Sequence, residues 1–175
     1  PKHLIATLQN RGRRARSLLA LMIRDSLTGL FNHTHTLYLL ELEINKADLN
    51  NSPICFAMLD IDYFKKINDN YGHPIGDRVL KSLSLFLKQR LRKTDHIGRY
   101  GGEEFAIVLP NTTERDAKTI INEIRERFAE LPQPAGSGNF TVEFSCGIAT
   151  SKGESAQSLC EKADQALYDA KRNGR

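Results

Sequence analysis

The order of hydrophobic and polar positions along the 175-residue chain predicts a mixture of helices and strands. Apolar residues repeat every three to four positions in several long segments, which predicts amphipathic helices at residues 34–49, 77–91, 113–131 and 155–172. Short apolar runs predict strands at 54–59, 96–100, 105–109 and 141–150. Residues 63–71 are expected to form one or two helical turns, and the expected loops are 24–33 and 132–139.

These strands are expected to form one mostly antiparallel sheet. The run at 54–59 is almost continuously apolar, which is typical of a central strand buried on both faces. The strands at 96–100 and 105–109 are separated by Gly101-Gly102-Glu103-Glu104, and its two glycines permit the positive φ angles of a tight hairpin turn. This order of elements predicts an α+β fold, a mostly antiparallel central sheet flanked by helices.

The apolar pattern of residues 1–24 predicts a helix that precedes this domain. Its apolar positions follow the three-and-four spacing of a heptad seam: Ile5, Leu8, Gly12, Ala15, Leu19 and Met22. One interpretation is an amphipathic helix that lies on its own domain. We favour a helical linker that pairs with a second copy, because a basic helix without acidic residues is poorly stable alone. We therefore expect a linker, 1–24, and a domain, 25–175, within a longer protein.

The composition allows a substantial core and excludes global disorder, because 40% of the residues are hydrophobic and 26% are charged. A net charge of +4 would suit a polyanionic partner. However, residues 1–24 contain six basic residues and no acidic ones. Residues 25–175 therefore carry nineteen basic and twenty-one acidic residues, a net charge of −2. The basic excess belongs to the linker, and no nucleic-acid partner is expected.

The sequence carries no pattern for export or for a membrane span. The longest apolar run, residues 18–23, is far shorter than the roughly 20 residues that cross a bilayer, and no signal-peptide pattern is present. The cysteines are scattered without metal-ligand spacing: Cys55, Cys146 and Cys160. These features favour the reducing cytoplasm, and they leave open a membrane tether elsewhere in a longer protein.

Two pairs of carboxylates lie at the ends of predicted elements. Asp60 and Asp62 follow the buried strand, and Glu103 and Glu104 occupy the hairpin turn. If these strands are neighbours, at least one carboxylate from each pair meets at one edge of the sheet. Converging carboxylates repel one another unless they hold a hard cation such as Mg²⁺, which can polarise a phosphoryl centre. Taken alone, each pair could equally be a solvated turn.

The residues that follow the first pair favour a nucleotide site over a solvated turn. Lys65 can neutralise phosphate charge. Asn68 and Asp77 can recognise the edge of a guanine base, because a carboxylate accepts hydrogen bonds from its N1 and N2 groups and an amide can contact O6 or N3. Carboxylates, a lysine and base-recognising groups in one stretch point to phosphoryl transfer on a nucleotide.

Four motifs in order along the chain closely resemble the GGDEF domain of diguanylate cyclases: DSLTGLFN, DIDYFKKINDNYGHPIGD, RYGGEEF and KADQALYDAK, the last followed by Gly174 and Arg175. The resemblance covers about residues 24–175 and implies a nucleotidyl-cyclase or palm-like fold. It also implies that two GTP molecules are joined into cyclic di-GMP with release of two pyrophosphates. His33 stands where the family usually has arginine, a departure that bears on a local contact more than on catalysis.

The same resemblance implies roles for individual residues. Mg²⁺, with Mn²⁺ as a tolerated substitute, is expected at Asp60, the backbone carbonyl of Ile61, and Glu103. Glu103 is also the expected general base for the ribose 3′-OH, and Lys65 is expected to stabilise the phosphoryl transition state. The other expected contacts to GTP are Asn68, His73, Asp77, Gly101, Gly102, Glu104, Lys171 and Arg175.

A second family motif, the RxxD of a product-binding inhibitory site, is matched by Arg92 and Asp95. Five residues separate Asp95 from Gly101, which is the family spacing. A guanidinium suits this role because it binds phosphate bidentately and stacks on guanine. The alternative is a helix C-terminus whose basic residues favour its dipole. The resemblance implies feedback inhibition by cyclic di-GMP.

Because the product contains two nucleotides, one active site with one GTP is not enough. A two-fold homodimer in which each domain presents its GTP to the other meets this need, and the linker could set their distance in response to an upstream sensory domain. Two rival functions stay open: a catalytically silent domain that senses GTP or cyclic di-GMP, and a palm-like nucleotidyl transferase or nucleotide cyclase with another substrate. Silent members usually lose signature carboxylates, which this chain keeps.

Overall fold

The computed structural model describes residues 14–15, 17–19 and 22–173. In chain order, its elements are α2 (His33–Asn50), β1 (Ile54–Ile61), α3 (Phe64–Tyr71), α4 (His73–Arg90), β2 (His96–Arg99), β3 (Glu104–Pro110), α5 (Glu114–Ala129), β4 (Gln133–Ala135), β5 (Gly138–Phe140), β6 (Phe144–Thr150) and α6 (Ala156–Arg172). Every helix and strand expected from residue 34 onward is present.

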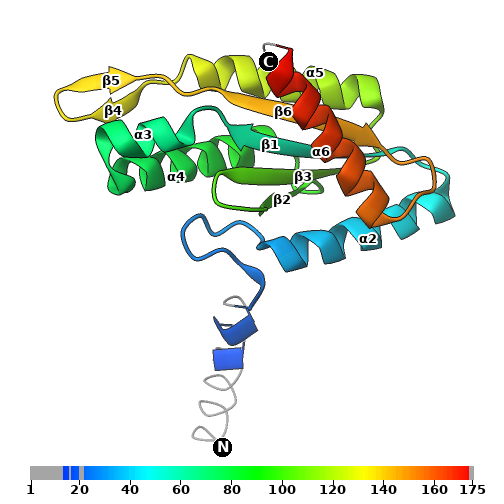
Figure 1. Ribbon diagram of the computed structural model, residues 1–175. Coiled ribbons are helices and arrows are strands. Elements are labelled where there is room, and N and C mark those ends of the chain that lie inside the picture. Colours follow the sequence, from blue (N-terminus) through cyan, green and yellow to red (C-terminus); the bar gives the residue numbers. More distant parts are fainter. Residues whose placement is uncertain (1–13, 16, 20–21, 174–175) are drawn as a thin grey trace, which may run out of the picture.

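A four-stranded antiparallel sheet in the order β2-β3-β1-β6 forms the centre of the domain (Figure 1). Its central strand β1 alternates between two cores. Cys55, Ala57 and Leu59 face the core covered by α4 and α5. Phe56 and Met58 face the core covered by α2 and α6. The expected α+β fold with a doubly buried central strand is confirmed.

Helix α6 lies unusually close to the edge strand β6 because β6 carries Gly147. A Cβ atom built on Gly147 would lie 2.2 Å from the carbonyl oxygen of Ala163 and 2.2 Å from the backbone nitrogen of Leu167. Both are backbone atoms in the middle of a helix, so they cannot move aside cheaply. Glycine therefore sets the distance and the register of α6 over the sheet, and with them the position of the helix's last turn.

Replacement of Gly147 by alanine is expected to lower the free energy of unfolding by about 3 kcal/mol, because the added methyl group forces α6 off the sheet. Urea denaturation followed by circular dichroism measures the change. Gly138→Ala is the matched control, because a Cβ there meets nothing within 4 Å. Equal stabilities of the two variants would show that α6 does not depend on this close approach.

Two helices begin earlier than their sequence pattern indicates. Helix α2 begins at His33, and its N-cap is Asn32 rather than Thr34, because the Asn32 side chain accepts a hydrogen bond from the backbone N–H of His35 at 2.9 Å. Helix α4 begins at His73 rather than at residue 77. The glycines and Pro74 of this stretch indicate a loop, yet proline is well tolerated in the first turn of a helix.

The expected loop at 132–139 contains a two-stranded hairpin, β4–β5, so that expectation was wrong. The hairpin is anchored to the helices beside it. The rings of Tyr71 and Phe140 stack with their centroids 4.4 Å apart, and Arg78 donates a hydrogen bond to the carbonyl of Pro134. Three-residue strands are too short for a two-residue periodicity to show. Strand β6 likewise begins at Phe144, three residues later than expected.

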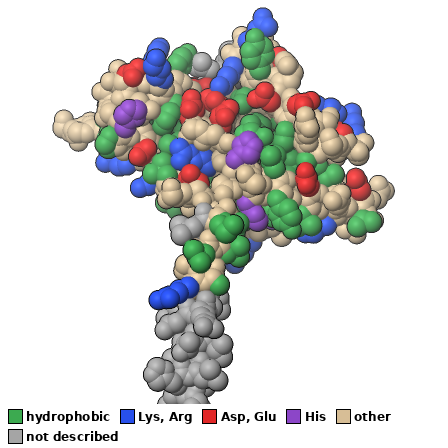
Figure 2. All heavy atoms as spheres, turned by 60° about the horizontal axis from the view of Figure 1, so that its bottom comes forward, with side chains coloured by type: hydrophobic (Ala, Val, Ile, Leu, Met, Phe, Trp, Pro, Cys, Tyr) green, Lys and Arg blue, Asp and Glu red, His purple; other side chains and the backbone are tan. Residues whose placement is uncertain are grey.

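The described part of the N-terminal segment is helical and leads away from the sheet and its helices (Figure 1). Its apolar side chains Leu18, Leu19 and Met22 are 62%, 56% and 74% exposed, and apolar side chains are visible where the segment joins the domain (Figure 2). The first half of the expected seam, residues 5–12, lies outside the described residues. Among the helices that the structure describes, none is long and apolar enough to cross a membrane.

Candidate active site

The end of β1 and the hairpin turn before β3 lie side by side. Asp60 is the register partner of Glu104, and the backbone N–H of Ile61 donates to the carbonyl of Glu103 at 3.2 Å. Asp62 is engaged elsewhere: its buried carboxylate accepts a hydrogen bond from Ser145 Oγ at 2.7 Å. Asp60 is therefore paired with Glu104, Ile61 contacts the backbone of Glu103, and Asp62 is bound to β6.

Four carboxylates form a cluster at this edge, because the charges of Asp60, Glu103 and Asp164 all act on Glu104. Burial raises the pKa of Glu104, and the negative charges of Asp60, Glu103 and Asp164 raise it further, whereas the ammonium of Lys171 lowers it. Asp164 comes from α6 and was not among the expected site residues, although it lies within the KADQALYDAK motif. Like charges near one another favour the protonated form of a carboxylate, and a nearby cation relieves the repulsion.

Lys171 supplies a cation to this cluster. Its Nζ lies 2.8 Å from Asp60 Oδ1, and the two side chains are 37% and 14% exposed. The sequence motif indicates that Lys171 contacts a phosphate. Its ion pair with the Asp60 carboxylate was not predicted and is shown by the structure. The other half of the expected basic pair, Arg175, lies outside the described residues, as does Gly174.

The oxygen ligands at this edge fit a hard divalent cation. No group of three His, Cys, Asp or Glu side chains within the described ranges is arranged to hold a metal on its own. Mg²⁺ does not require one, since it commonly takes one or two carboxylates and completes its shell with water and substrate phosphates. Asp60, Glu103 and the carbonyl of Ile61 would provide that donor set, and the crowding of carboxylates gives a reason for a cation to bind.

The two glycines of the turn play different parts. A Cβ on Gly101 would lie 2.3 Å from Glu104 Oε2, so Gly101 makes room for a carboxylate of the cluster. A Cβ on Gly102 would meet nothing within 4 Å, and this residue is exposed. The protein itself therefore gives no packing reason for a glycine at 102.

A chain of hydrogen bonds that the sequence did not reveal fixes this turn. The Arg99 guanidinium donates to the carbonyl of Gly102 at 2.8 and 3.1 Å and to Asp25 Oδ1 at 3.1 Å. Partial burial opposes ionisation of Asp25, yet hydrogen bonds from Thr28 and Arg99 lower the pKa of Asp25 overall. Asp25 and Arg99 both lie in the recognised motifs. The motifs therefore marked these two residues, but they did not indicate that the residues contact each other.

His33, the departure from the family pattern, makes a local contact beside the same turn. Its Nδ1 lies 2.9 Å from the carbonyl oxygen of Tyr100. Its ring also stacks on the Tyr100 ring, with the centroids 4.0 Å apart. The histidine at position 33 therefore affects contacts that hold the hairpin turn, and it does not contact the carboxylate cluster.

The expected base-recognising residues lie on α3 and α4, next to the end of β1. Tyr63, with φ +56°, turns the chain sharply from β1 into α3. Asn68 Oδ1 is buried and has no hydrogen-bond partner among the residues described, and a Cβ on Gly76 would lie 1.9 Å from it. Gly76 of α4 thus makes room for the Asn68 amide. The neighbouring expected residues are exposed: Lys65, His73 and Asp77.

Arg92 and Asp95 form a compact unit at the opposite end of α4. Asp95 Oδ2 accepts from the backbone N–H of Arg92 at 2.8 Å, and Arg92 Nη2 donates to Thr112 Oγ1 at 2.6 Å. The Asp95 side chain is 1% exposed, whereas that of Arg92 is 51% exposed. Asp95 therefore holds the backbone and side chain of Arg92, and the guanidinium remains accessible to a ligand.

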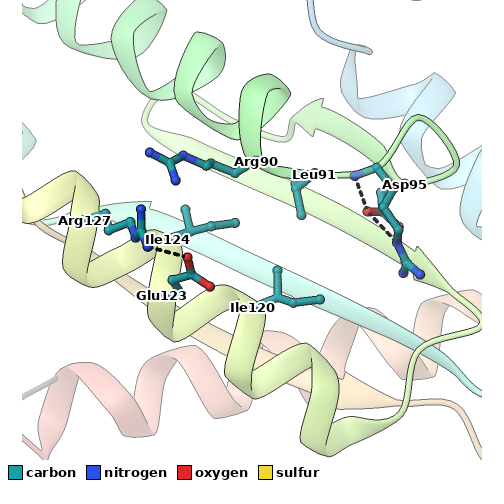
Figure 3. A pocket seen from close by; sticks show the side chains of 8 residues that line it. Arg90, Leu91, Asp95, Ile120, Glu123, Ile124 and Arg127 are labelled. Atoms are coloured by element: carbon teal, nitrogen blue, oxygen red, sulfur yellow. Dashed lines mark hydrogen bonds and ion pairs between the residues drawn. The ribbon is translucent and has the colours of Figure 1, made fainter.

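A cavity of about 190 Å³ lies beside this unit, between the end of α4 and α5 (Figure 3). Arg90 and Arg127 line it with Arg92. Glu123 lines it too, and its carboxylate lies 3.1 Å from Arg127. The sequence did not point to the α5 residues, because no motif marks them and only the packing of α5 against α4 brings them to Arg92.

Comparisons with known proteins agree with these observations. Residues 22–175 match the family described as diguanylate cyclase, GGDEF domain. Response regulator PleD of Caulobacter vibrioides is 37% identical over 161 residues, which cover 90% of this chain and 36% of PleD. Diguanylate cyclase DgcP of Pseudomonas aeruginosa is 40% identical over 154 residues, which cover 87% of this chain and 23% of DgcP. The chain thus spans about a third or less of these relatives.

A solved structure shows a similarity that extends to the N-terminal segment. The coiled coil and GGDEF domain of DgcB from Caulobacter crescentus, in complex with c-di-GMP, matches with a TM-score of 0.93 and 31% sequence identity. The match covers 99% of this chain and 93% of that chain. The fold of this chain therefore agrees with that of a GGDEF domain.

Proposed function

The chain belongs to the GGDEF family of diguanylate cyclase domains, and from this premise we propose that residues 25–175 condense two GTP molecules into cyclic di-GMP and two pyrophosphates. The observation that carries the proposal is the carboxylate cluster of Asp60, Glu103 and Glu104 where β1 meets the hairpin turn. Carboxylates gathered at one edge can hold the divalent cation that phosphoryl transfer from a nucleotide requires.

We assign a separate role in the reaction to each of these residues. When bound, a divalent cation, for which we propose Mg²⁺ with Mn²⁺ as a substitute, polarises the phosphate under attack. Asp60, Glu103 and the Ile61 carbonyl would hold it. Glu103 accepts the proton of the ribose 3′-OH, and Lys65 stabilises negative charge that develops on the phosphoryl group. Glu104 assists with the cation or the ribose.

Recognition of GTP is assigned to α3, α4 and the hairpin turn. The buried, unpartnered Oδ1 of Asn68 supports a role for its amide in base recognition, because buried polar atoms normally have a hydrogen-bond partner. Asp77 would accept hydrogen bonds from guanine, which disfavours ATP, and His73 lies one helical turn before it. Gly101 and Gly102 let the backbone approach the phosphates, and Lys171 and Arg175 add positive charge.

Joining two nucleotides requires two such domains, and we propose a homodimer formed through the N-terminal helix. The exposed Leu18, Leu19 and Met22 support this, as does the coiled coil of the DgcB fragment. Turnover per chain is then expected to rise with chain concentration, and Leu19→Asp to lower it. Turnover that is independent of concentration and unaffected by Leu19→Asp would contradict the dimer. An upstream sensory domain and a cytoplasmic location complete the proposal.

Incubation with GTP and Mg²⁺, followed by chromatography of the nucleotides, separates this function from its rivals. A cyclase converts GTP into cyclic di-GMP and pyrophosphate. A silent sensing domain binds GTP and leaves it intact, and another nucleotidyl transferase or cyclase releases a different product. Only the first result agrees with the proposal.

We also propose that cyclic di-GMP inhibits the enzyme at Arg92, whose exposed guanidinium is held by Asp95 and Thr112. Arg92→Ala is expected to raise the concentration of cyclic di-GMP that halves the initial rate by at least about tenfold, because hydrogen bonds to charged groups contribute about 1.5–3 kcal/mol. Arg115→Ala, an exposed site on α5, is the matched control. Inhibition that is equally strong in both variants would rule out this site.

A further inference from the structure

The ion pair between Lys171 and Asp60 joins two residues to which the proposed function assigns different partners. Asp60 is expected to bind the divalent cation, and Lys171 the phosphates of GTP. In the structure, Lys171 Nζ instead lies 2.8 Å from Asp60 Oδ1. An oxygen that is expected to bind the cation is therefore already bound to an ammonium group of the protein.

We propose that Lys171 is an internal counter-ion that holds Asp60 in the nucleotide-free protein and competes with the divalent cation for this carboxylate. The inference rests on the proposed function in one respect, the choice of Asp60 as a metal ligand. It adds a role for Lys171 before any nucleotide is bound.

The surrounding charges explain why a counter-ion is needed. The Asp60 side chain is 14% exposed and its register partner is Glu104, on which the charges of Asp60, Glu103 and Asp164 act together. Without a cation, this arrangement would be strongly repulsive. Lys171 carries the compensating charge on a flexible stem, and lysine is well suited to exchange partners because its ammonium is a point charge without a fixed geometry.

The fold places Lys171 at the carboxylate cluster, whereas the next residue, Arg172, contacts a different side chain. Gly147 fixes the register of α6 over the sheet, and Lys171 lies in the last turn of that helix. The next residue, Arg172, lies over the ring of Tyr168, with its guanidinium carbon 5.8 Å from the ring centroid. Two adjacent residues of equal charge thus differ in whether they contact the carboxylates.

The consequence is a coupling between cation binding and nucleotide binding. With Lys171 on Asp60, the protein alone has a reduced affinity for a divalent cation. When the phosphates of GTP arrive, Lys171 can exchange a carboxylate for a phosphate and leave Asp60 to the cation, so neither anion loses its partner. The lysine therefore favours occupancy of the site by cation and nucleotide together.

Binding of Mn²⁺ alone to the nucleotide-free protein tests this directly, with free Mn²⁺ measured by electron paramagnetic resonance. Lys171→Met is expected to bind Mn²⁺ at least about tenfold more tightly than the unaltered chain, because a like charge next to the ligand has been removed. Arg172→Met removes the same charge without touching Asp60, and its affinity is expected to stay within about twofold. Lys171→Gln, with a polar head group, is expected to show the same gain.

A further variant shows whether the tighter binding of Mn²⁺ arises at the Asp60 carboxylate. Adding Asp60→Asn to Lys171→Met is expected to abolish the tighter binding. The inference is overturned if Lys171→Met binds Mn²⁺ no more tightly than Arg172→Met, or if the gain survives Asp60→Asn. Because no GTP is present, the result is independent of whether cyclic di-GMP is made, and a failure of the proposed function would be distinguished from a failure of this inference.

Discussion

Replacing Glu103 by glutamine is expected to lower the rate of cyclic di-GMP formation by at least about 1,000-fold while the domain stays folded. The amide has nearly the same shape as the carboxylate, but it neither accepts the 3′-OH proton nor carries the negative charge that a divalent cation requires. The contact between the Glu103 carbonyl and the Ile61 N–H involves the backbone and is unaffected. Initial rates measured by chromatography, with circular dichroism for the fold, test this.

Glu126→Gln is the matched control for this variant, because Glu126 is an exposed residue of α5. Its rate is expected to equal that of the unaltered chain. If Glu103→Gln retained more than about a tenth of the activity, Glu103 would be neither the general base nor a metal ligand.

The second large effect is expected at Gly102, where Gly102→Ala should lower kcat/KM for GTP by about 100-fold without changing stability. A Cβ at this position meets no protein atom within 4 Å, so the folded domain tolerates it. The expected loss comes only from a nucleotide that must pass close to the backbone. Steady-state kinetics with GTP and a urea unfolding curve measure the two quantities.

Gly138→Ala, in the β4–β5 hairpin, controls for the same chemical change at another open glycine. It is expected to leave both kinetics and stability unchanged. A Gly102→Ala variant with normal kcat/KM would mean that the phosphates do not approach this turn, and GTP would have to bind elsewhere.

The sheet was predictable because its central strand and its hairpin turn each carry a simple signal. Residues 54–59 are apolar on both faces, and the structure buries them in two separate cores. The glycine-rich turn likewise indicated the β2–β3 hairpin. The start of α4 and the short β4–β5 hairpin were not predictable in the same way. Pro74 suggests a break although it fits a first helical turn, and the hairpin is held by contacts such as Tyr71 with Phe140.

In the candidate site, residue types could be predicted but their partners could not. The carboxylates and Lys171 stand in recognisable motifs, yet the pairing of Lys171 with Asp60 depends on where Gly147 lets α6 lie on β6. The contact of Arg99 with Asp25 joins residues 74 positions apart. Such contacts follow from packing in three dimensions, and local periodicity contains no information about them.

The measurement that tests the central claim most directly is the product stoichiometry after incubation of the chain with GTP and Mg²⁺. We expect one cyclic di-GMP for every two pyrophosphates, no reaction with ATP, and no product from Glu103→Gln. GTP that is bound but recovered unchanged, or a cyclic mononucleotide as the product, would contradict the assignment of this domain as a diguanylate cyclase.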